Sequence, residues 1–197
     1  MVETLSIYRL KVSIKHLRPP VWRRLEVAGD TTFAAFHEVL QRAFGWTDSH
    51  LHQFVVEGGF IGPSDLDEDG WGPPVRDERR LRLGPFLGER VRRFVYEYDF
   101  GDGWEHEVVV EKVLPADPGV RYPRCTAGRR ACPPEDSGGP WGYVELLAAV
   151  NDPTHPDAEH LREWLGEDFD SEAFDLAAVN AALAPRRPRP RRSPVAG

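Results

Sequence analysis

Acidic residues and a histidine lie close together in two segments of the chain and could bind a metal ion. The first segment is YDFGDGWEH at 98–106, and the second is CPPED at 132–136. The candidate functional residues in them are Asp99, Asp102, Trp104, His106, Glu135 and Asp136. A metal ion held by carboxylates and an imidazole activates a bound water for hydrolysis, so these residue types fit a metal-dependent reaction. The same acids could equally cap turns in these glycine- and proline-rich segments.

Two cysteines suggest a second ligand set. Cys125 and Cys132 are separated by six residues, whereas zinc knuckles usually have two residues between their cysteines. A tetrahedral zinc site needs four ligands, so His106 and Asp136 would have to join the two thiolates, with Glu135 as an alternative. Packed or loop thiols explain the cysteines without a metal, and a disulfide is the least favoured interpretation in a reducing compartment. The sequence therefore permits zinc as a cofactor without requiring it.

His50 and His52 are secondary candidates for the same chemistry. They flank Leu51 at the start of an expected strand, and side chains two residues apart on a strand project from the same face. Two histidines alone fall short of the number of ligands that a metal ion usually takes. Solvated or hydrogen-bonded side chains are therefore the favoured interpretation.

The elements that must position these residues follow from the spacing of apolar side chains, which predicts an α+β fold with a mixed or antiparallel sheet. Apolar and polar residues alternate in five stretches that we expect to be strands, near residues 5–15, 21–28, 51–57, 94–100 and 104–112. Helical spacing and capping residues predict helices near 32–44, 142–151, 157–165 and 175–183. Glycine and proline dominate residues 58–88 and 121–143, which we therefore expect to be irregular loops.

The segment 94–112 has the pattern of a β-hairpin with one aromatic face. A three-residue turn at 101–103 would place Tyr98 opposite His106. His106 would then lie on the aromatic face, which is expected to pack in the core. A buried imidazole loses free energy unless it is paired, so we expect His106 to hydrogen-bond to a neighbour such as a tyrosine hydroxyl, or to bind a ligand.

Composition indicates one globular domain. The chain has 197 residues, 41% of them hydrophobic, and six tryptophans, which is enough to bury a substantial core. The N-terminal residues lack the features of a secretory signal, and charges interrupt every later apolar stretch, so we expect a cytoplasmic protein without a membrane segment. We predict a single domain at 1–184, followed by a disordered, arginine- and proline-rich tail at 185–197.

Charge is distributed unevenly between this domain and the tail. The net charge is −7, although the tail carries only basic residues, so the domain itself is strongly acidic. An acidic domain is a poor match for the phosphate backbone of nucleic acids. The tail could contact nucleic acid through Arg186, Arg187, Arg189, Arg191 and Arg192. A solubilising tail is the plainer interpretation, because charge runs are usually solvated.

Several motifs occur in order along the chain. They are FHE and FGW within 36–46, HLHQF at 50–54, YDFGDGWEH at 98–106, PRC at 123–125 and CPPED at 132–136. With these motifs the chain resembles the plasmid pRiA4b ORF-3-like family, which includes the passenger protein of some insertion sequences, sometimes labelled TnpR. The resemblance implies an α+β fold and a cytosolic protein often carried on mobile elements, but no settled activity. Members commonly have a third cysteine where this chain has Ser137, which counts against a three-thiolate metal site.

Three functional hypotheses follow. The first is a non-enzymatic accessory or interaction protein of mobile genetic elements, whose partner is a protein or nucleic acid of such a system. The second is a metal-dependent hydrolase or nuclease that uses the Asp102/His106 and Cys125/Cys132/Asp136 segments. The third is a DNA-binding accessory protein that acts through its basic tail. The first is favoured, because no complete catalytic constellation is visible in the sequence.

Overall fold

A computed structural model of the chain describes residues 5–67, 72–166 and 168–185. The strands are β1 (Ser6–Ile14), β2 (Trp22–Ala28), β3 (His52–Val56), β4 (Gly59–Gly62), β5 (Val75–Asp77), β6 (Arg93–Tyr98), β7 (Trp104–Pro115) and β8 (Arg124–Arg129). The helices are α1 (Phe33–Phe44), α2 (Gly139–Asn151), α3 (Ala158–Leu165) and α4 (Leu176–Leu183), with a short 3-10 helix at Ser64–Asp67.

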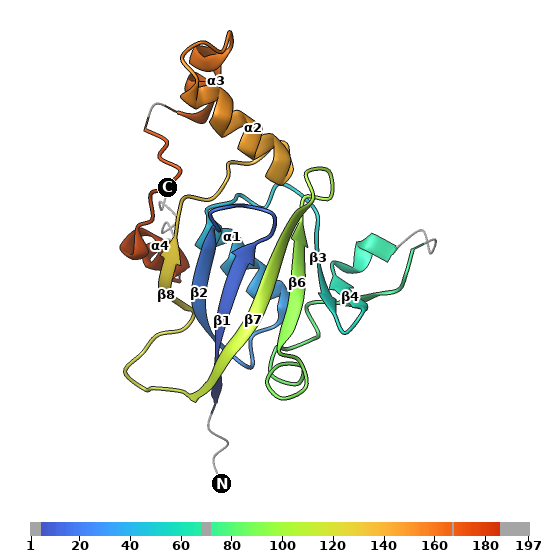
Figure 1. Cartoon of the computed structure of the whole chain (residues 1–197). Helices are drawn as coiled ribbons and strands as arrows, with labels where there is room; N and C mark the ends of the chain where they lie inside the picture. The colour runs from blue at the N-terminus through green and yellow to red at the C-terminus, as the bar shows by residue number, and fades with distance from the viewer. Residues whose placement is uncertain (1–4, 68–71, 167, 186–197) are drawn as a thin grey trace, which may run out of the picture.

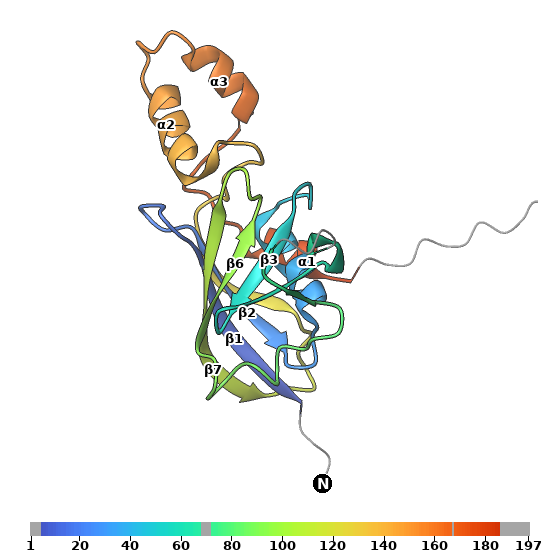
Figure 2. The same cartoon turned by 90° about the vertical axis from the view of Figure 1, so that its right-hand side faces the viewer.

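The eight strands form one mixed sheet in the order β5-β4-β3-β6-β7-β1-β2-β8. All pairs are antiparallel except β4 with β5. Helix α1 covers one face of the sheet, and α2 and α3 project beyond one end of it (Figures 1 and 2). None of the helices in the described ranges is long and apolar enough to cross a membrane.

The predicted α+β class is confirmed, and all five expected strands and four expected helices are present. Three strands were not predicted: β4 and β5 lie in the expected loop at 58–88, and β8 lies in the expected loop at 121–143. Strands β5 and β8 form the two edges of the sheet and bury few side chains, so they carry little of the alternation that identifies a strand. Pairing with β4 and β2, respectively, holds them in place.

Helix α1 is capped as its sequence predicts. The hydroxyl of Thr32 accepts the backbone N–H of Ala35 at 3.1 Å, and Gly45 ends the helix with a φ of 90°. The apolar face of the helix packs on the sheet through an aromatic cluster in which Phe33 meets Phe54 with ring centroids 5.1 Å apart. At the C-terminal end of the helix, Phe44 packs edge-on against His106 of β7 with ring centroids 5.1 Å apart.

The hairpin of β6 and β7 differs from the expected register. Tyr98 lies opposite Trp104, and His106 lies opposite Tyr96, so the predicted pairing of Tyr98 with His106 is wrong. The connection has five residues rather than three, because Asp99 leaves the strand with a φ of 54° and its carboxylate accepts two backbone N–H groups of the loop. Asp99 therefore belongs to the loop at the end of the sheet.

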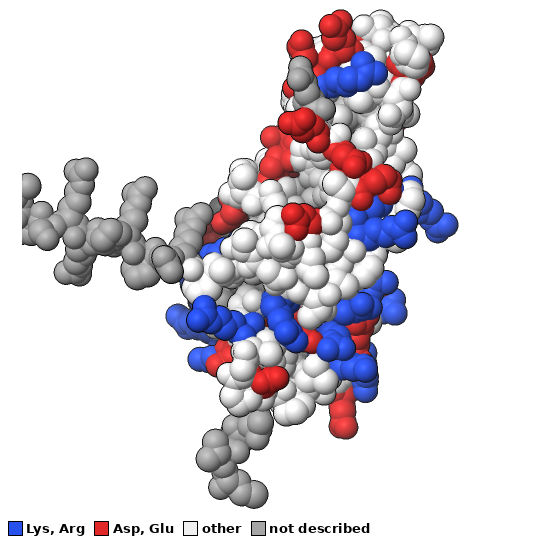
Figure 3. Space-filling model, turned by 90° about the vertical axis from the view of Figure 1, so that its left-hand side faces the viewer, with Lys and Arg blue, Asp and Glu red and all other residues white. Residues whose placement is uncertain are grey.

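Charged side chains gather in different regions of the surface. Figure 3 shows acidic side chains around α2 and α3 and a concentration of lysine and arginine over the sheet. One buried carboxylate, that of Glu26, lies between Arg9 and Arg124, each at 2.7 Å. The predicted tail at 185–197 lies outside the described residues except for Pro185, and so do all five tail arginines.

Candidate functional site

The loop between β6 and β7 meets the segment that precedes α2 at one end of the sheet (Figure 1). Carboxylates from both segments surround His50. The Nε2 atom of His50 lies 3.1 Å from Oδ1 of Asp136, 3.6 Å from Oδ2 of Asp99 and 3.9 Å from Oε2 of Glu135. The structure therefore brings together His50, Asp99 and Asp136, with Glu135 beside them. All four are candidates from the sequence. The central imidazole is that of a secondary candidate, His50.

Two aspartates of this group take a backbone conformation that is unusual for residues other than glycine. The φ angles of Asp99 and Asp136 are 54° and 55°, in the left-handed region that aspartate tolerates better than most residues. The loops that carry them are fastened together, because the Asp102 carboxylate accepts the backbone N–H of Gly138 at 3.0 Å. At Gly139, a β carbon would lie 2.1 Å from the Asp102 carbonyl oxygen. The close approach requires glycine at that position.

The carboxylates of Asp99 and Glu135 accept hydrogen bonds within the protein and each also directs an oxygen toward His50. In Glu135 this oxygen, Oε2, also accepts the hydroxyl of Tyr98 at 3.3 Å. Oδ1 of Asp99 accepts two N–H groups of its own loop at 3.0 and 3.2 Å, and its Oδ2 faces the imidazole. Oε1 of Glu135 accepts the N–H of Thr47 at 2.8 Å and the hydroxyl of Tyr98 at 3.0 Å. Burial raises the pKa of Tyr98, so its hydroxyl keeps the proton that it donates. The acids are thus oriented by neighbours, as metal ligands usually are.

The imidazole of His50 lies at ion-pair distance from three carboxylates but is not hydrogen-bonded to them. Its Nε2 atom is buried, yet it makes no hydrogen bond with any described residue. Ligand atoms bound at about 2.1 Å to one ion lie about 3.0 to 3.4 Å apart in octahedral or tetrahedral geometry. The two shorter separations around Nε2 are close to this range, and the three ligand atoms of His50, Asp99 and Asp136 all lie within 4.8 Å of one another. The geometry suits one divalent cation.

The site is open on one side. The Asp136 side chain is 73% exposed, whereas that of Asp99 is buried. A cleft of about 360 Å³ begins at Asp136 and continues between the helices of the α2–α3 pair. It is lined by Asp136, Ser137, Gly138, Leu146, His160, Leu161 and Trp164. A molecule in this cleft would have direct access to Asp136.

Comparisons with known proteins agree on one family. The family model described as plasmid pRiA4b ORF-3-like protein matches residues 6–178. The chain belongs to this family. It is 41% identical over 180 residues to the uncharacterized protein y4hQ of Sinorhizobium fredii (strain NBRC 101917 / NGR234), covering 90% of this chain and 91% of that protein. A crystal structure of MM3350, a protein of unknown function from Methanosarcina mazei Go1, superposes with a TM-score of 0.80 at 40% identity, covering 88% of this chain and 97% of that one.

In this pRiA4b ORF-3-like protein a second histidine cluster lies between α1, which carries His37, and β3, which carries His52. The rings of His37 and His52 stack with centroids 3.4 Å apart, and with Asp48 they also offer ligand atoms within 4.8 Å of one another. These atoms are already paired: His37 bonds to Tyr96 and Asp48 at 2.7 and 2.8 Å, and His52 bonds to Glu78 at 2.8 Å. Burial and the neighbouring His52 lower the pKa of His37. Hydrogen bonding accounts for this cluster without a ligand.

The structure places His106 in the core of the protein, as its alternation predicts. The side chain is fully buried, its Nδ1 atom lies 3.3 Å from the carbonyl oxygen of Tyr96, and its ring packs edge-on against Phe44 and Trp46. Burial lowers the pKa of His106 to about 3, so the imidazole is neutral. Trp104 is buried as well. The expected hydrogen bond to a neighbour is thus formed by Nδ1 with a backbone carbonyl, whereas the buried Nε2 atom has no hydrogen-bond partner among the described residues.

The two cysteines do not join the acidic residues. Cys125 donates its thiol hydrogen to the Ala127 carbonyl at 3.2 Å, and Cys132 packs against the core. Burial raises the pKa of both thiols, whereas a metal ligand must be a thiolate. Within the described ranges, no group of three or more metal-binding side chains contains Cys125, Cys132 or His106. The ligand set expected from the sequence is therefore not assembled.

Proposed function

We propose that the protein binds one divalent metal ion through His50, Asp99 and Asp136 and uses it to activate water in a hydrolytic reaction. The observation that carries the proposal is the buried Nε2 atom of His50, which faces three carboxylate oxygens and hydrogen-bonds to none of them. This moves the hydrolase hypothesis from the Asp102/His106 and cysteine segments to the residues around His50.

The charges of the group support a cation. Three carboxylates within 4 Å of one imidazole nitrogen would repel one another, and a divalent ion would offset that repulsion. One imidazole with carboxylates suits zinc, manganese or ferrous iron rather than a soft ion such as copper(I). The hydrogen bonds from Tyr98, Thr47 and the 99–103 loop would fix the ligand orientations before an ion arrives.

Hydrolytic chemistry fits the exposure of the group. A bound divalent ion supplies a water of lowered pKa at neutral pH. Asp99 is buried and would hold the ion in position, while Asp136 borders the cleft through which a substrate would enter. Oε2 of Glu135 is the farthest of the three oxygens from Nε2, at 3.9 Å, and accepts the Tyr98 hydroxyl at 3.3 Å. Its remaining lone pair would accept a proton from the attacking water.

Metal titration of tag-free, full-length protein tests the proposal. We expect about one equivalent of Zn²⁺ or Mn²⁺ to bind by calorimetry. His50→Gln and Asp99→Asn are each expected to weaken binding by about 100-fold or more, because loss of a ligand costs at least as much as loss of an outer-shell partner. His155→Gln, a histidine outside the group, should leave the affinity unchanged.

Two outcomes would contradict parts of this proposal. Equal metal affinity in His50→Gln and wild type would remove the site. Metal binding without hydrolysis of any ester or phosphodiester in a nitrophenyl substrate panel would leave a metal site but remove the hydrolase assignment.

A separate observation favours the hypothesis of an accessory or interaction protein of mobile genetic elements such as insertion sequences. Trp141 on α2 is 71% exposed and Trp164 on α3 is 48% exposed, and Val144, also on α2, is exposed as well. Large apolar side chains in such a projecting pair of helices are typical of protein-binding surfaces. We propose that a protein partner binds the α2–α3 pair. Nucleic-acid binding by the tail stays a prediction.

Affinity capture from the native cell tests this second function. The wild-type protein is expected to retain a defined partner that a Trp141→Ser/Trp164→Ser variant loses, because aromatic side chains usually dominate binding energy at such surfaces. The matched control is Phe100→Ser, which removes an exposed aromatic side chain from the β6–β7 loop. Retention of the same proteins by all three forms would exclude an interaction through α2 and α3.

A further inference from the structure

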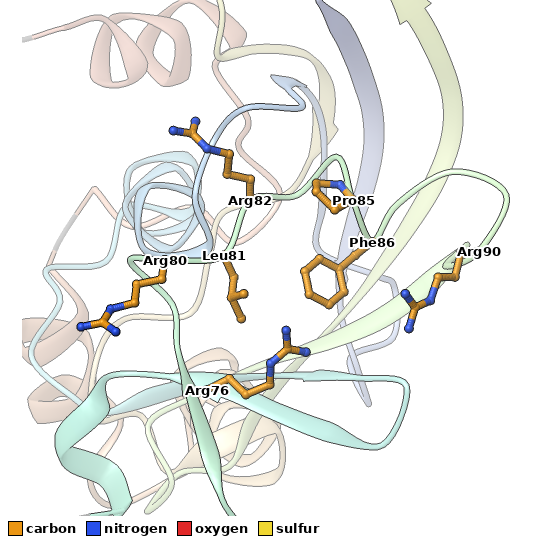
Figure 4. Close-up of a pocket in the computed structure, with 7 residues that line it drawn as sticks. All are labelled: Arg76, Arg80, Leu81, Arg82, Pro85, Phe86 and Arg90. Atoms are coloured by element: carbon orange, nitrogen blue, oxygen red, sulfur yellow. The ribbon is translucent and has the colours of Figure 1, made fainter.

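A pocket lined by arginines lies at the β5 edge of the sheet, away from the candidate metal site. Its volume is about 410 Å³. It is lined by Arg76, Arg80, Leu81, Arg82, Pro85, Phe86 and Arg90 (Figure 4). Four of these seven residues are arginines and none is acidic. The lining is therefore strongly basic with a partly apolar wall.

Two of the arginines are directed into the hollow. In Figure 4 the side chains of Arg76 and Arg90 point toward each other near the ring of Phe86, while Arg80 and Arg82 extend away from it. The guanidinium carbon of Arg76 lies 5.1 Å from the centre of the Phe86 ring. Stacking on an aromatic ring restricts the guanidinium group before a ligand arrives, so less side-chain entropy is lost when the ligand binds.

The charge of Arg76 is available to a ligand. Arg90 donates two hydrogen bonds to the Glu57 carboxylate, at 2.9 and 2.6 Å, and Arg80 pairs with Asp77 at 3.2 Å. Both arginines are largely exposed, so water screens these pairs. No carboxylate of the described residues pairs with Arg76. Among the described residues, an anion between Arg76 and Arg90 would have to displace Glu57 from the guanidinium group of Arg90.

The surrounding sequence strengthens the positive potential. Residues 75–93 contain seven arginines and three acidic residues, in a chain whose net charge is −7. Small anions are attracted to such a local excess of positive charge, whereas the acidic remainder of the protein repels a long polyanion. The charge distribution therefore favours a small ligand over a nucleic-acid strand.

We propose that this pocket binds a small organic phosphate. Arginine presents a planar fork of donors that matches phosphate oxygens, so Arg76 and Arg90 would hold the phosphate group. The apolar wall of Leu81, Pro85 and Phe86 would contact the organic part. This binding function is independent of the metal ion proposed at His50.

Calorimetric titration of the full-length protein with phenyl phosphate tests the proposal, in the presence of a chelator so that bound metal does not contribute. We expect a Kd of about 1 mM or lower. Arg76→Gln is expected to weaken binding about tenfold or more, and Arg76→Lys, which keeps the charge but loses the fork, by a smaller factor. The matched control is Arg79→Gln, an exposed arginine outside the lining, which should change Kd by less than about twofold.

The proposal would be overturned by an absence of binding heat at about 10 mM phenyl phosphate. Equal losses in Arg76→Gln and Arg79→Gln would also overturn it, because they would indicate unspecific attraction. A short single-stranded oligonucleotide that binds more tightly than phenyl phosphate, and does so through Arg76, would reassign the pocket to nucleic acid.

Discussion

Replacement of Gly139 by alanine is expected to destabilise the protein by about 3 kcal/mol or more and to abolish metal binding at His50. The new β carbon would lie 2.1 Å from the carbonyl oxygen of Asp102, and both partners belong to backbone that cannot rotate away. The φ of 70° at Gly139 adds strain. Relief requires the 99–103 loop to separate from the segment that carries Asp136, and the proposed ligands would separate with them.

Gly103→Ala is the matched control for this prediction. Gly103 lies next to Asp102 in the 99–103 loop and also has a positive φ, of 68°, but a β carbon there would meet no atom within 4 Å. It is therefore expected to cost only about 1 to 2 kcal/mol, the strain of a left-handed alanine. Urea unfolding gives both free energies and titration gives the metal affinities. Equal losses in the two variants would mean that strain alone, rather than the contact with Asp102, explains the requirement for glycine.

Acidification below about pH 6.5 is expected to destabilise the protein through His106. The pKa of this buried imidazole is about 3 in the folded protein, against about 6.5 in an unfolded chain. Between these values the unfolded state binds a proton that the folded state does not, so stability falls as the pH falls. The slope is about 1.4 kcal/mol per pH unit, or about 4 to 5 kcal/mol over the whole interval. The lowered pKa of His37 acts in the same direction.

His106→Phe should remove most of this slope, because phenylalanine fits an aromatic neighbourhood and does not titrate. The measurement is the free energy of unfolding in urea at a series of pH values from 7 to about 4. His160→Gln, which removes an exposed histidine, should leave the slope as it is in the wild type. A wild-type slope retained in His106→Phe would assign the acid sensitivity to other groups.

The sequence predicted most of the fold because most elements are amphipathic. Each of these elements buries one face. That face appears in the sequence as alternation in β1, β2, β3, β6 and β7 and as helical spacing in α1. Strand β8 escaped prediction because pairing with β2, not its own pattern, makes it a strand. The register of the hairpin was missed because the Asp99 carboxylate, rather than a glycine turn, organises the loop.

The candidate site was only partly predictable. Asp99 and Asp136 were recognised from residue type, and the structure places both beside His50. His50 is only a secondary candidate in the sequence, because two histidines on a strand fall short of the number of ligands that a metal ion takes. His106 lies in the same motif as Asp99, yet strand alternation turns its side chain into the core while Asp99 remains in the loop. Contacts between loops distant in sequence leave no local periodicity, so the role of His50 became visible only in the folded chain.

The three proposed ligands His50, Asp99 and Asp136 come from three separate segments: the loop before β3, the β6–β7 loop and the approach to α2. An ion held there would act as a reversible cross-link that closes two long stretches of chain. Because unfolded chains do not present these side chains together, its binding free energy would add directly to the stability of the folded state. Thermal unfolding of this protein would then depend on metal concentration, so the melting temperature itself would report whether the site is filled.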